Sequence, residues 1–144
     1  MKDDVFTNYE PVDGIASFSC GYLTYSFTYK KDDDGFLHPE LSVIMHQAGV
    51  GERSDRDLLI VFNDVIAMRW SPDSYSGLDK THLSKVRNGG STCALRYSNS
   101  SLYLKKYIET YPHLGTGHLN YFMCAENDLL EVIALPDAKA QWMS

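Results

Sequence analysis

Histidine is the residue type in this chain best suited to chemistry near neutral pH, as an acid–base group or a metal ligand. The 144 residues contain five: His38, His46, His82, His113 and His118. The H-E-x-x-H motif is absent, and no Cys/His pairs have zinc spacing. His38 and His46 are about 26 Å apart on an extended strand, so they cannot share a metal unless the chain folds back. His113 and His118 flank a glycine loop and can approach each other or an acid.

Other motifs of catalysis and cofactor binding are also missing. The G-x-S-x-G elbow of hydrolases does not occur, and the glycines at 115 and 117 lack the Lys-Ser/Thr of a phosphate loop. Asp32, Asp33 and Asp34 are consecutive, whereas an EF-hand calcium loop needs oxygens at alternate positions. We therefore assign no catalytic residue, metal ligand or cofactor, and expect that the chain is not an enzyme.

The three cysteines do not form a metal or disulfide motif. Cys20, Cys93 and Cys124 are an odd set without a C-x-x-C pair, and each lies in an expected strand. Such residues are typical buried, reduced thiols, and a disulfide or a nucleophile is the alternative.

Composition and charge indicate one globular domain over residues 1–144. Hydrophobic residues make up 44%, which excludes global disorder. The formal net charge of −6 disfavours nucleic acid and anionic membranes as partners, and suits a basic protein. No apolar run reaches the ~18–20 residues that span a membrane, and residues 1–10 lack a signal-peptide pattern. We therefore expect a cytoplasmic location.

The segment His118–Leu135 predicts a central β-hairpin. A two-residue turn at Asn127-Asp128 would pair Ala125 with Leu130 and Tyr121 with Ala134. Both faces of this hairpin are largely apolar, so the two strands belong in the interior of a sheet that is covered on both sides.

The residues before this hairpin predict the main helix, at about 100–111. Asn99-Ser100-Ser101 supplies N-cap candidates. Apolar side chains then recur at helical spacing, and Pro112 ends the run. We expect this helix to lie across one face of the sheet.

A second hairpin is predicted nearer the N-terminus. Ile15–Lys30 reads as a strand with a β-bulge at Gly21, where the apolar alternation changes phase. A three-residue loop with Gly35 in its left-handed position would pair Asp32 with Phe36. Phe36–Gln47 is then the second strand, and Pro39 indicates an edge strand or a strand start.

The remaining segments complete an α+β fold with a mostly antiparallel sheet. Leu58–Phe62 and Val65–Trp70 form a third strand or a kinked pair, with a bulge or tight turn at Asn63-Asp64 between them. Within Ser71–Ser91 a short second helix is indicated at about 78–86, and Thr92–Tyr97 is a further strand. We expect residues 1–14 to form a loose arm with Val5 and Phe6 docked, and residues 136–144 to form a short tail with Trp142 against the body.

Tyrosine is the residue type that points to function. Ten of the 144 residues are tyrosines, and tyrosine is enriched at protein interfaces; a tyrosine-rich sheet is the alternative. Combined with the acidic charge, this favours a protein that plugs a basic cleft. The expected partner-binding residues are Asp32, Asp33, Asp34, Tyr75, Glu126 and Asp128.

The end of the chain resembles a known class of proteins. The segments Leu119–Cys124 (LNYFMC) and Leu129–Ala134 (LLEVIA), after a helix, resemble bacterial immunity proteins. The resemblance implies a non-enzymatic inhibitor that binds a cognate toxin of a contact-dependent or type VI secretion system. It carries no site residue over to this chain.

Two other functions remain open at this stage. One is a small-molecule-binding domain or small enzyme, with a pocket between sheet and helix near His113, His118 and Ser71–Ser91. The other is a subunit of a homo-oligomer, in which an exposed edge strand such as Phe36–Gln47 pairs with its symmetry mate.

Overall fold

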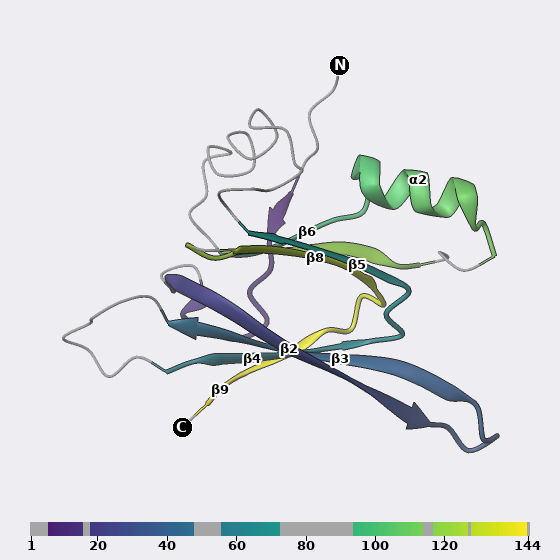
Figure 1. Cartoon of the computed structure of the whole chain (residues 1–144), viewed down its shortest axis with the longest axis horizontal. Coiled ribbons are helices and arrows are strands. Elements are labelled where there is room, and N and C mark those ends of the chain that lie inside the picture. Colours follow the sequence, from purple (N-terminus) through teal and green to yellow (C-terminus); the bar gives the residue numbers. More distant parts are fainter. Residues whose placement is uncertain are drawn as a thin grey trace.

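Two antiparallel sheets stacked face to face form the molecule. The computed structural model describes residues 6–15, 18–47, 56–72, 94–113, 117–126 and 128–143. Sheet A contains, in spatial order, β1 (Thr7–Asn8), β6 (Leu95–Ser98), β7 (Leu119–Cys124), β8 (Asp128–Ala134) and β5 (Ala67–Pro72). Sheet B contains β2 (Cys20–Lys31), β3 (Leu37–Gln47), β4 (Leu58–Asn63) and β9 (Lys139–Trp142). One helix, α2 (Leu102–Thr110), lies on the side of sheet A that faces away from sheet B (Figure 1). The predicted α+β, mostly antiparallel fold is confirmed.

The core fills the space between the two sheets. Alternate side chains along each strand point inward, so apolar residues at every second position meet in the middle. Each large side chain that is fully buried in this way contributes about 1.5–3 kcal/mol. The buried side chains of β3 and β4 are Leu41, Val43, Met45, Leu58, Ile60 and Phe62, and those of β7 and β8 that face the core are Tyr121, Met123, Leu130, Val132 and Ala134.

The predicted hairpin near the N-terminus is present with its predicted register. Phe27 pairs with Leu41, and the ladder has its irregularity between Cys20 and Tyr22, where the bulge was expected. Gly35 has φ +86° and completes the three-residue loop. The alternative that Pro39 marks an edge strand is wrong, because β3 lies between β2 and β4. Pro39 is tolerated there because it stands near the start of β3, beyond the last pair with β4.

The central hairpin β7–β8 lies in the interior of sheet A, as predicted, but its register differs. Tyr121 pairs with Val132 rather than with Ala134. The turn closes one residue earlier than expected, because the Ala125 N–H bonds the Asp128 carbonyl at 2.9 Å. Asp128 is thus a strand residue, and its carboxylate accepts the indole N–H of Trp70 at 2.9 Å. The shift of two residues keeps every side chain on its predicted face.

The chain crosses from sheet B to sheet A at the corner between β4 and β5. Asp64 has φ +49° there, a conformation that Asn and Asp tolerate better than most residues. After the corner, the Ile66 N–H bonds the Ile133 carbonyl at 2.9 Å, so β5 enters sheet A beside β8. Of the two predicted alternatives, the kinked pair is correct.

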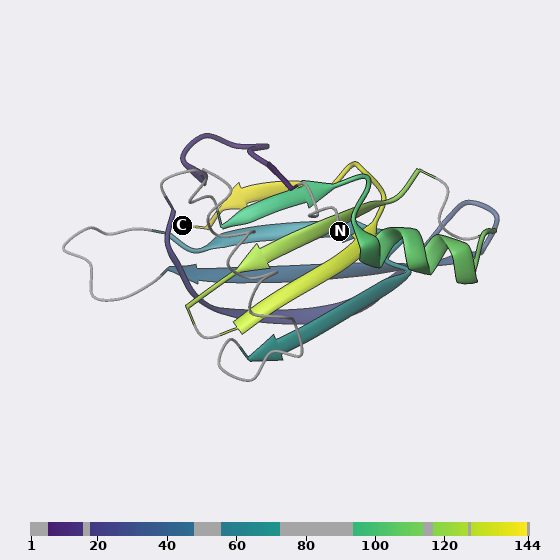
Figure 2. The same ribbon diagram turned by 90° about the horizontal axis from the view of Figure 1, so that it is seen from above.

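Helix α2 covers one end of sheet A rather than the whole face (Figure 2). Ser101 caps it by accepting the Leu104 N–H at 3.2 Å, and donates its hydroxyl to Asn120 Oδ1 of β7 at 2.7 Å. The Tyr107 hydroxyl bonds the Ile66 carbonyl at 2.8 Å. Of the predicted apolar stripe only Leu104 is fully buried, and Tyr111 is exposed. The one helix in the described segments, nine residues long, is too short to cross a membrane.

Both chain ends contribute edge strands, which differs from the expected loose arm and short tail. Residues 7–8 pair with β6 as β1, and Phe6 packs on Phe122 with ring centroids 5.4 Å apart. Near the C-terminus β9 pairs with β4. Trp142 docks as expected: it packs against Phe18 and donates its indole N–H to the Asp13 carbonyl. Segments of two and four residues are too short for their alternation to be recognised. The expected second helix at 78–86 lies outside the described residues.

The double role of Ser101 generates a stability prediction. Ser101→Ala removes the helix cap and leaves the buried Asn120 Oδ1 without its donor, so we expect the free energy of unfolding to fall by about 2 kcal/mol. Urea denaturation measures this change. Ser100→Ala, one residue away and exposed, is the control and should change stability by less than about 0.5 kcal/mol. Equal effects of the two substitutions would contradict the assigned cap.

Candidate binding surface

The β2–β3 hairpin extends past the rest of sheet B. The ladder between β2 and β3 continues to Lys31 and Leu37, whereas the ladder between β3 and β4 ends at Glu40. Residues 29–39, which we call the arm, therefore have only each other as ladder partners. In Figure 1 the arm projects at the lower right.

The loop at the end of the arm is closed by Asp32. Its carboxylate accepts the N–H groups of Asp34 and Phe36, both at 2.9 Å, and its own N–H bonds the Phe36 carbonyl. Short polar side chains commonly hold turns in this way. The loop conformation is thus set by local contacts that do not involve the core.

His38 ties the arm to the corner between the sheets. Its Nε2 is 2.7 Å from Asp32 Oδ2, and its Nδ1 is 2.7 Å from Asp64 Oδ1. A carboxylate against each ring nitrogen favours the doubly protonated imidazolium. The hydrogen bond to Asp32, followed by that to Asp64, raises the pKa of His38 above its ordinary value. The bond from His38, followed by the Phe36 N–H, lowers the pKa of Asp32. We call these three residues the histidine clamp.

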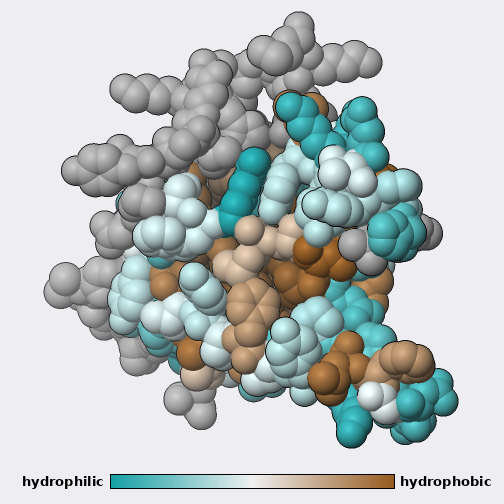
Figure 3. Space-filling model, turned by 45° about the vertical axis from the view of Figure 1, so that its right-hand side comes forward, coloured by the Kyte–Doolittle hydropathy of each residue, from teal (hydrophilic) through white to brown (hydrophobic). Residues whose placement is uncertain are grey.

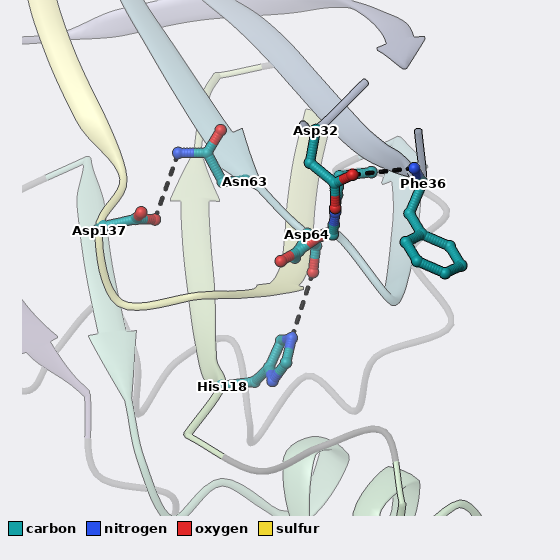
Figure 4. A network of polar contacts seen from close by, with 7 residues as sticks. Asp32, Phe36, Asn63, Asp64, His118 and Asp137 are labelled. Atoms are coloured by element: carbon teal, nitrogen blue, oxygen red, sulfur yellow. Dashed lines mark hydrogen bonds and ion pairs between the residues drawn. The ribbon is translucent and has the colours of Figure 1, made fainter. Parts of the chain in front are cut away.

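An open hollow of about 410 Å³ lies beside the clamp. Lys30, Lys31, Glu40 and Asp137 bring charges of both signs to its wall. Much of this charge is already paired: Lys30 lies 3.7 Å from Glu40, and Asp137 accepts the side-chain N–H of Asn63. Figure 4 shows Asn63–Asp137 and the neighbouring contact between His118 and the Asp64 carbonyl. Both ring nitrogens of His38 are occupied, so the arrangement braces the arm rather than presenting a basic nitrogen to a substrate.

The hollow is not where a ligand pocket was expected. The sequence suggested a pocket between sheet and helix, near His113 and His118, whereas this hollow lies between the arm and the β4–β5 corner. The His118 ring lies 3.2 Å from the Asp64 carbonyl, next to this hollow. Within the described ranges, no group of three or more His, Cys, Asp or Glu side chains is arranged to hold a metal ion.

Exposed apolar side chains concentrate on the same hairpin. Of the nine large apolar side chains that are exposed in the described part of the chain, six belong to β2, its loop and the start of β3. Tyr29 and Phe36 are each 68% exposed, and Leu37 is 60% exposed. Figure 3 shows apolar surface at the middle of this side and again on the projecting arm at the lower right. Grouped exposure of this kind marks interaction surfaces.

The predicted partner-binding residues do not form one surface. Asp32, Asp33 and Asp34 lie on the arm, but the Glu126 N–H bonds the carbonyl of Cys20, at the opposite end of β2. Twelve residues of extended strand separate these ends by about 36 Å. Asp128 is 6% exposed, so it cannot meet a partner directly. The predicted acids therefore lie in two separate places, and their role in partner binding stays a prediction. Tyr75 lies outside the described residues.

Sequence reasoning missed the apolar side chains of the arm. Leu37 and Tyr29 belong to an alternating apolar pattern, which does not report whether another sheet covers the side chains. The available signal was strand length: β2 has twelve residues, whereas β4 and β7 have six each. A strand that outruns its neighbours leaves part of its inner face in water.

The described thiols have no role in this surface. Cys20 is buried as expected, and burial raises its pKa, which disfavours the reactive thiolate. Cys124 is partly buried. Cys93 lies outside the described residues.

The clamp predicts a pH dependence. Because the pKa of His38 is raised on folding, its contribution to stability is fully present below about pH 6.5 and is lost as pH rises through the folded-state value. The pKa of Asp32 is lowered on folding, so the pH dependence of its contribution to stability is the opposite. That contribution is lost as pH falls below about 4. NMR titration of the His38 ring should give a midpoint above 6.5, and Asp64→Asn should lower that midpoint.

The control for this titration is Asp33→Asn, which removes a neighbouring charge outside the clamp and should leave the midpoint nearly unchanged. A midpoint at or below 6.5, or one insensitive to Asp64→Asn, would show that the clamp is not formed in solution.

Comparison of the chain with protein-family models, with curated proteins and with solved structures found no match.

Proposed function

We propose that this protein is a non-enzymatic inhibitor of another protein, an immunity protein that acts in the cytoplasm and blocks the active site of a cognate bacterial toxin. The observation that carries the proposal is the projecting arm with its exposed apolar end. The contact residues are those of the arm tip, which we define as Asp33, Asp34, Phe36 and Leu37. This region differs from the acidic patch expected earlier, since Glu126 and Asp128 are not part of it.

The shape of the arm suits insertion into a cleft. A narrow hairpin can enter an enzyme active site that a flat surface cannot reach. The side chains of Phe36 and Leu37 would be the buried anchors, because a few large side chains usually carry most of the binding energy of an interface. The Asp32 loop bonds and the histidine clamp hold these anchors in place before binding, which reduces the entropy lost on association.

Charge supports a basic partner, such as a nuclease. The chain has a net charge of −6. On the arm, the Asp32 carboxylate is occupied by His38 and by the loop N–H groups. Asp33 and Asp34 are exposed beside it, where they can meet the cationic side chains that such an enzyme uses to hold phosphates.

The anchors can be tested with the toxin candidate encoded next to this gene, or with a partner isolated from the native cell. Phe36→Ser with Leu37→Ser should weaken binding at least about thirtyfold. The double variant should also fail to restore growth to cells that express the toxin. Calorimetry gives the affinity and a growth assay gives the protection.

The matched control is Leu102→Ser, which alters a similarly exposed leucine on helix α2, on the outer side of sheet A, whereas the arm belongs to sheet B. It should leave both affinity and protection intact. Undiminished protection by the arm variant, or an equal loss with the control, would exclude the arm tip as the inhibitory element.

The acidic residues of the arm tip make a separate kinetic prediction. Asp33→Lys with Asp34→Lys should slow association about tenfold at low ionic strength, because the partner is expected to be basic. The difference should shrink as salt is added. Stopped-flow measurement of the association rate tests this effect. Glu10→Lys with Glu109→Lys makes the same change in net charge at exposed sites elsewhere, and an equal slowing by that pair would refute local steering.

A further inference from the structure

Among the residues that the structure describes, no strand covers the outer edge of sheet B. In the described part of the chain, β2 pairs only with β3 and ends the sheet. It is twelve residues long, and the stretch Leu23–Tyr29 contains no proline and no charge. Natural proteins usually protect an edge strand with prolines or charged side chains, because an uncovered strand offers its backbone groups to another strand.

The alternation of hydrogen-bonded pairs between β2 and β3 shows which backbone groups of β2 face outward. Asp32 and Phe36 form a hydrogen-bonded pair, since the Asp32 N–H bonds the Phe36 carbonyl. Hydrogen-bonded and non-bonded pairs alternate along an antiparallel ladder. The even-numbered residues of β2 back to Tyr22 therefore bond to β3, and the odd-numbered residues from Leu23 to Tyr29 direct their N–H and C=O groups away from it.

We propose that this edge pairs with the same edge of a second copy of the chain, antiparallel and with the twofold axis at Ser26. The stretch Thr24-Tyr25-Ser26-Phe27-Thr28 is nearly palindromic: hydroxyl, aromatic, hydroxyl, aromatic, hydroxyl. A twofold interface requires a patch that is complementary to itself. When Ser26 faces Ser26 of the second copy, Thr24 faces Thr28 and Tyr25 faces Phe27. The twofold axis repeats each of these pairs on its other side. Threonine–threonine and aromatic–aromatic pairs are both favourable across strands.

The side chains also meet on matching faces. Tyr25 and Phe27 lie on the inner face of sheet B, with their rings 6.5 Å apart, and are each nearly half exposed. The threonines and Ser26 lie on the outer face. Pairing would bring the two aromatic pairs together into one row across the axis, and Leu23 would face Tyr29.

The positions of the lysines select this register over its neighbours. With the axis at Ser26, Lys30 faces Tyr22, an aromatic ring that suits a cation, and Lys31 faces Gly21. Moving the axis to Phe27 would set Lys31 against the buried Leu23, and moving it to Tyr25 would set Lys30 against the buried Cys20. Each chain has a net charge of −6, but the proposed register places no like charges opposite each other between Tyr22 and Lys30.

The pairing would join two four-stranded sheets into one continuous sheet. It uses β2 up to Lys30 and leaves the arm tip outside the paired stretch. The inference is therefore independent of the proposed inhibitory role, and the arm-tip variant Phe36→Ser with Leu37→Ser should still form the dimer.

Position 26 is the residue that meets itself, which provides the first test. Ser26→Lys and Ser26→Glu, each alone, place like charges at the axis, and the dimer dissociation constant should rise at least a hundredfold. An equimolar mixture of the two variants should recover a dimer with one copy of each. Sedimentation or light scattering reads the mass against the 16.3 kDa of one chain.

A second pair of variants tests the register within one chain. Thr24→Lys with Thr28→Glu sets opposite charges against each other across the axis and should keep the dimer. Thr24→Lys with Thr28→Lys sets like charges there and should break it. All these positions are exposed, so circular dichroism should show the same fold in every variant, and amide exchange at Tyr25 and Phe27 should slow as wild-type concentration rises.

Several outcomes would overturn the proposal. A wild-type chain that stays monomeric at its highest soluble concentration excludes the dimer. A dimer that survives Ser26→Lys, or that is broken equally by both Thr24/Thr28 double variants, excludes this edge and register.

Discussion

The structure depends on one constraint: each sheet buries its inner face against the other sheet. Where one sheet extends beyond the other, the inner face of the longer sheet stays in water. Sheet B has the two longest strands, β2 and β3, whereas β7 and β8 of sheet A are about half as long. Side chains of β3 under the central hairpin, such as Val43, are completely buried. Farther along the same face, Tyr29 and Leu37 are exposed. The arm follows from this difference in strand length, whereas the open aromatic edge follows from the position of β2 at the end of sheet B.

Polar contacts then give the overhanging hairpin a defined position that apolar packing cannot supply. The Asp32 carboxylate closes the loop, and His38 links that carboxylate to Asp64 at the corner where the chain changes sheets. The corner is itself fixed to sheet A, because the Ile66 N–H bonds the carbonyl of Ile133. A chain of hydrogen bonds thus runs from the end of the arm to the interior strand β8. Since all members of the clamp are partly exposed, its strength depends on pH and salt more than the strength of the core does.

Sequence reasoning succeeded where turn chemistry and side-chain alternation agreed. In the hairpin β2–β3, turn chemistry and alternation indicated the same loop. The predicted register, bulge and glycine position were therefore correct. In β7–β8 the alternation was right but the turn signal was weak, and Asp128 joined the strand to bond Trp70. The candidate site was largely missed, because an inner-face apolar residue such as Tyr29 has the same sequence pattern whether or not another sheet covers it. Coverage depends on the lengths of strands distant in sequence, which local patterns do not report.

The central claim, that sheet B extends beyond its cover, can be measured directly by NMR with a soluble paramagnetic probe. We expect strong broadening of the ring signals of Tyr29 and Phe36, and little broadening for Phe62 and Tyr121, which are fully buried in the core. Rings of Tyr29 and Phe36 that are as well protected as that of Tyr121 would contradict the account, because the arm would then be folded against the body.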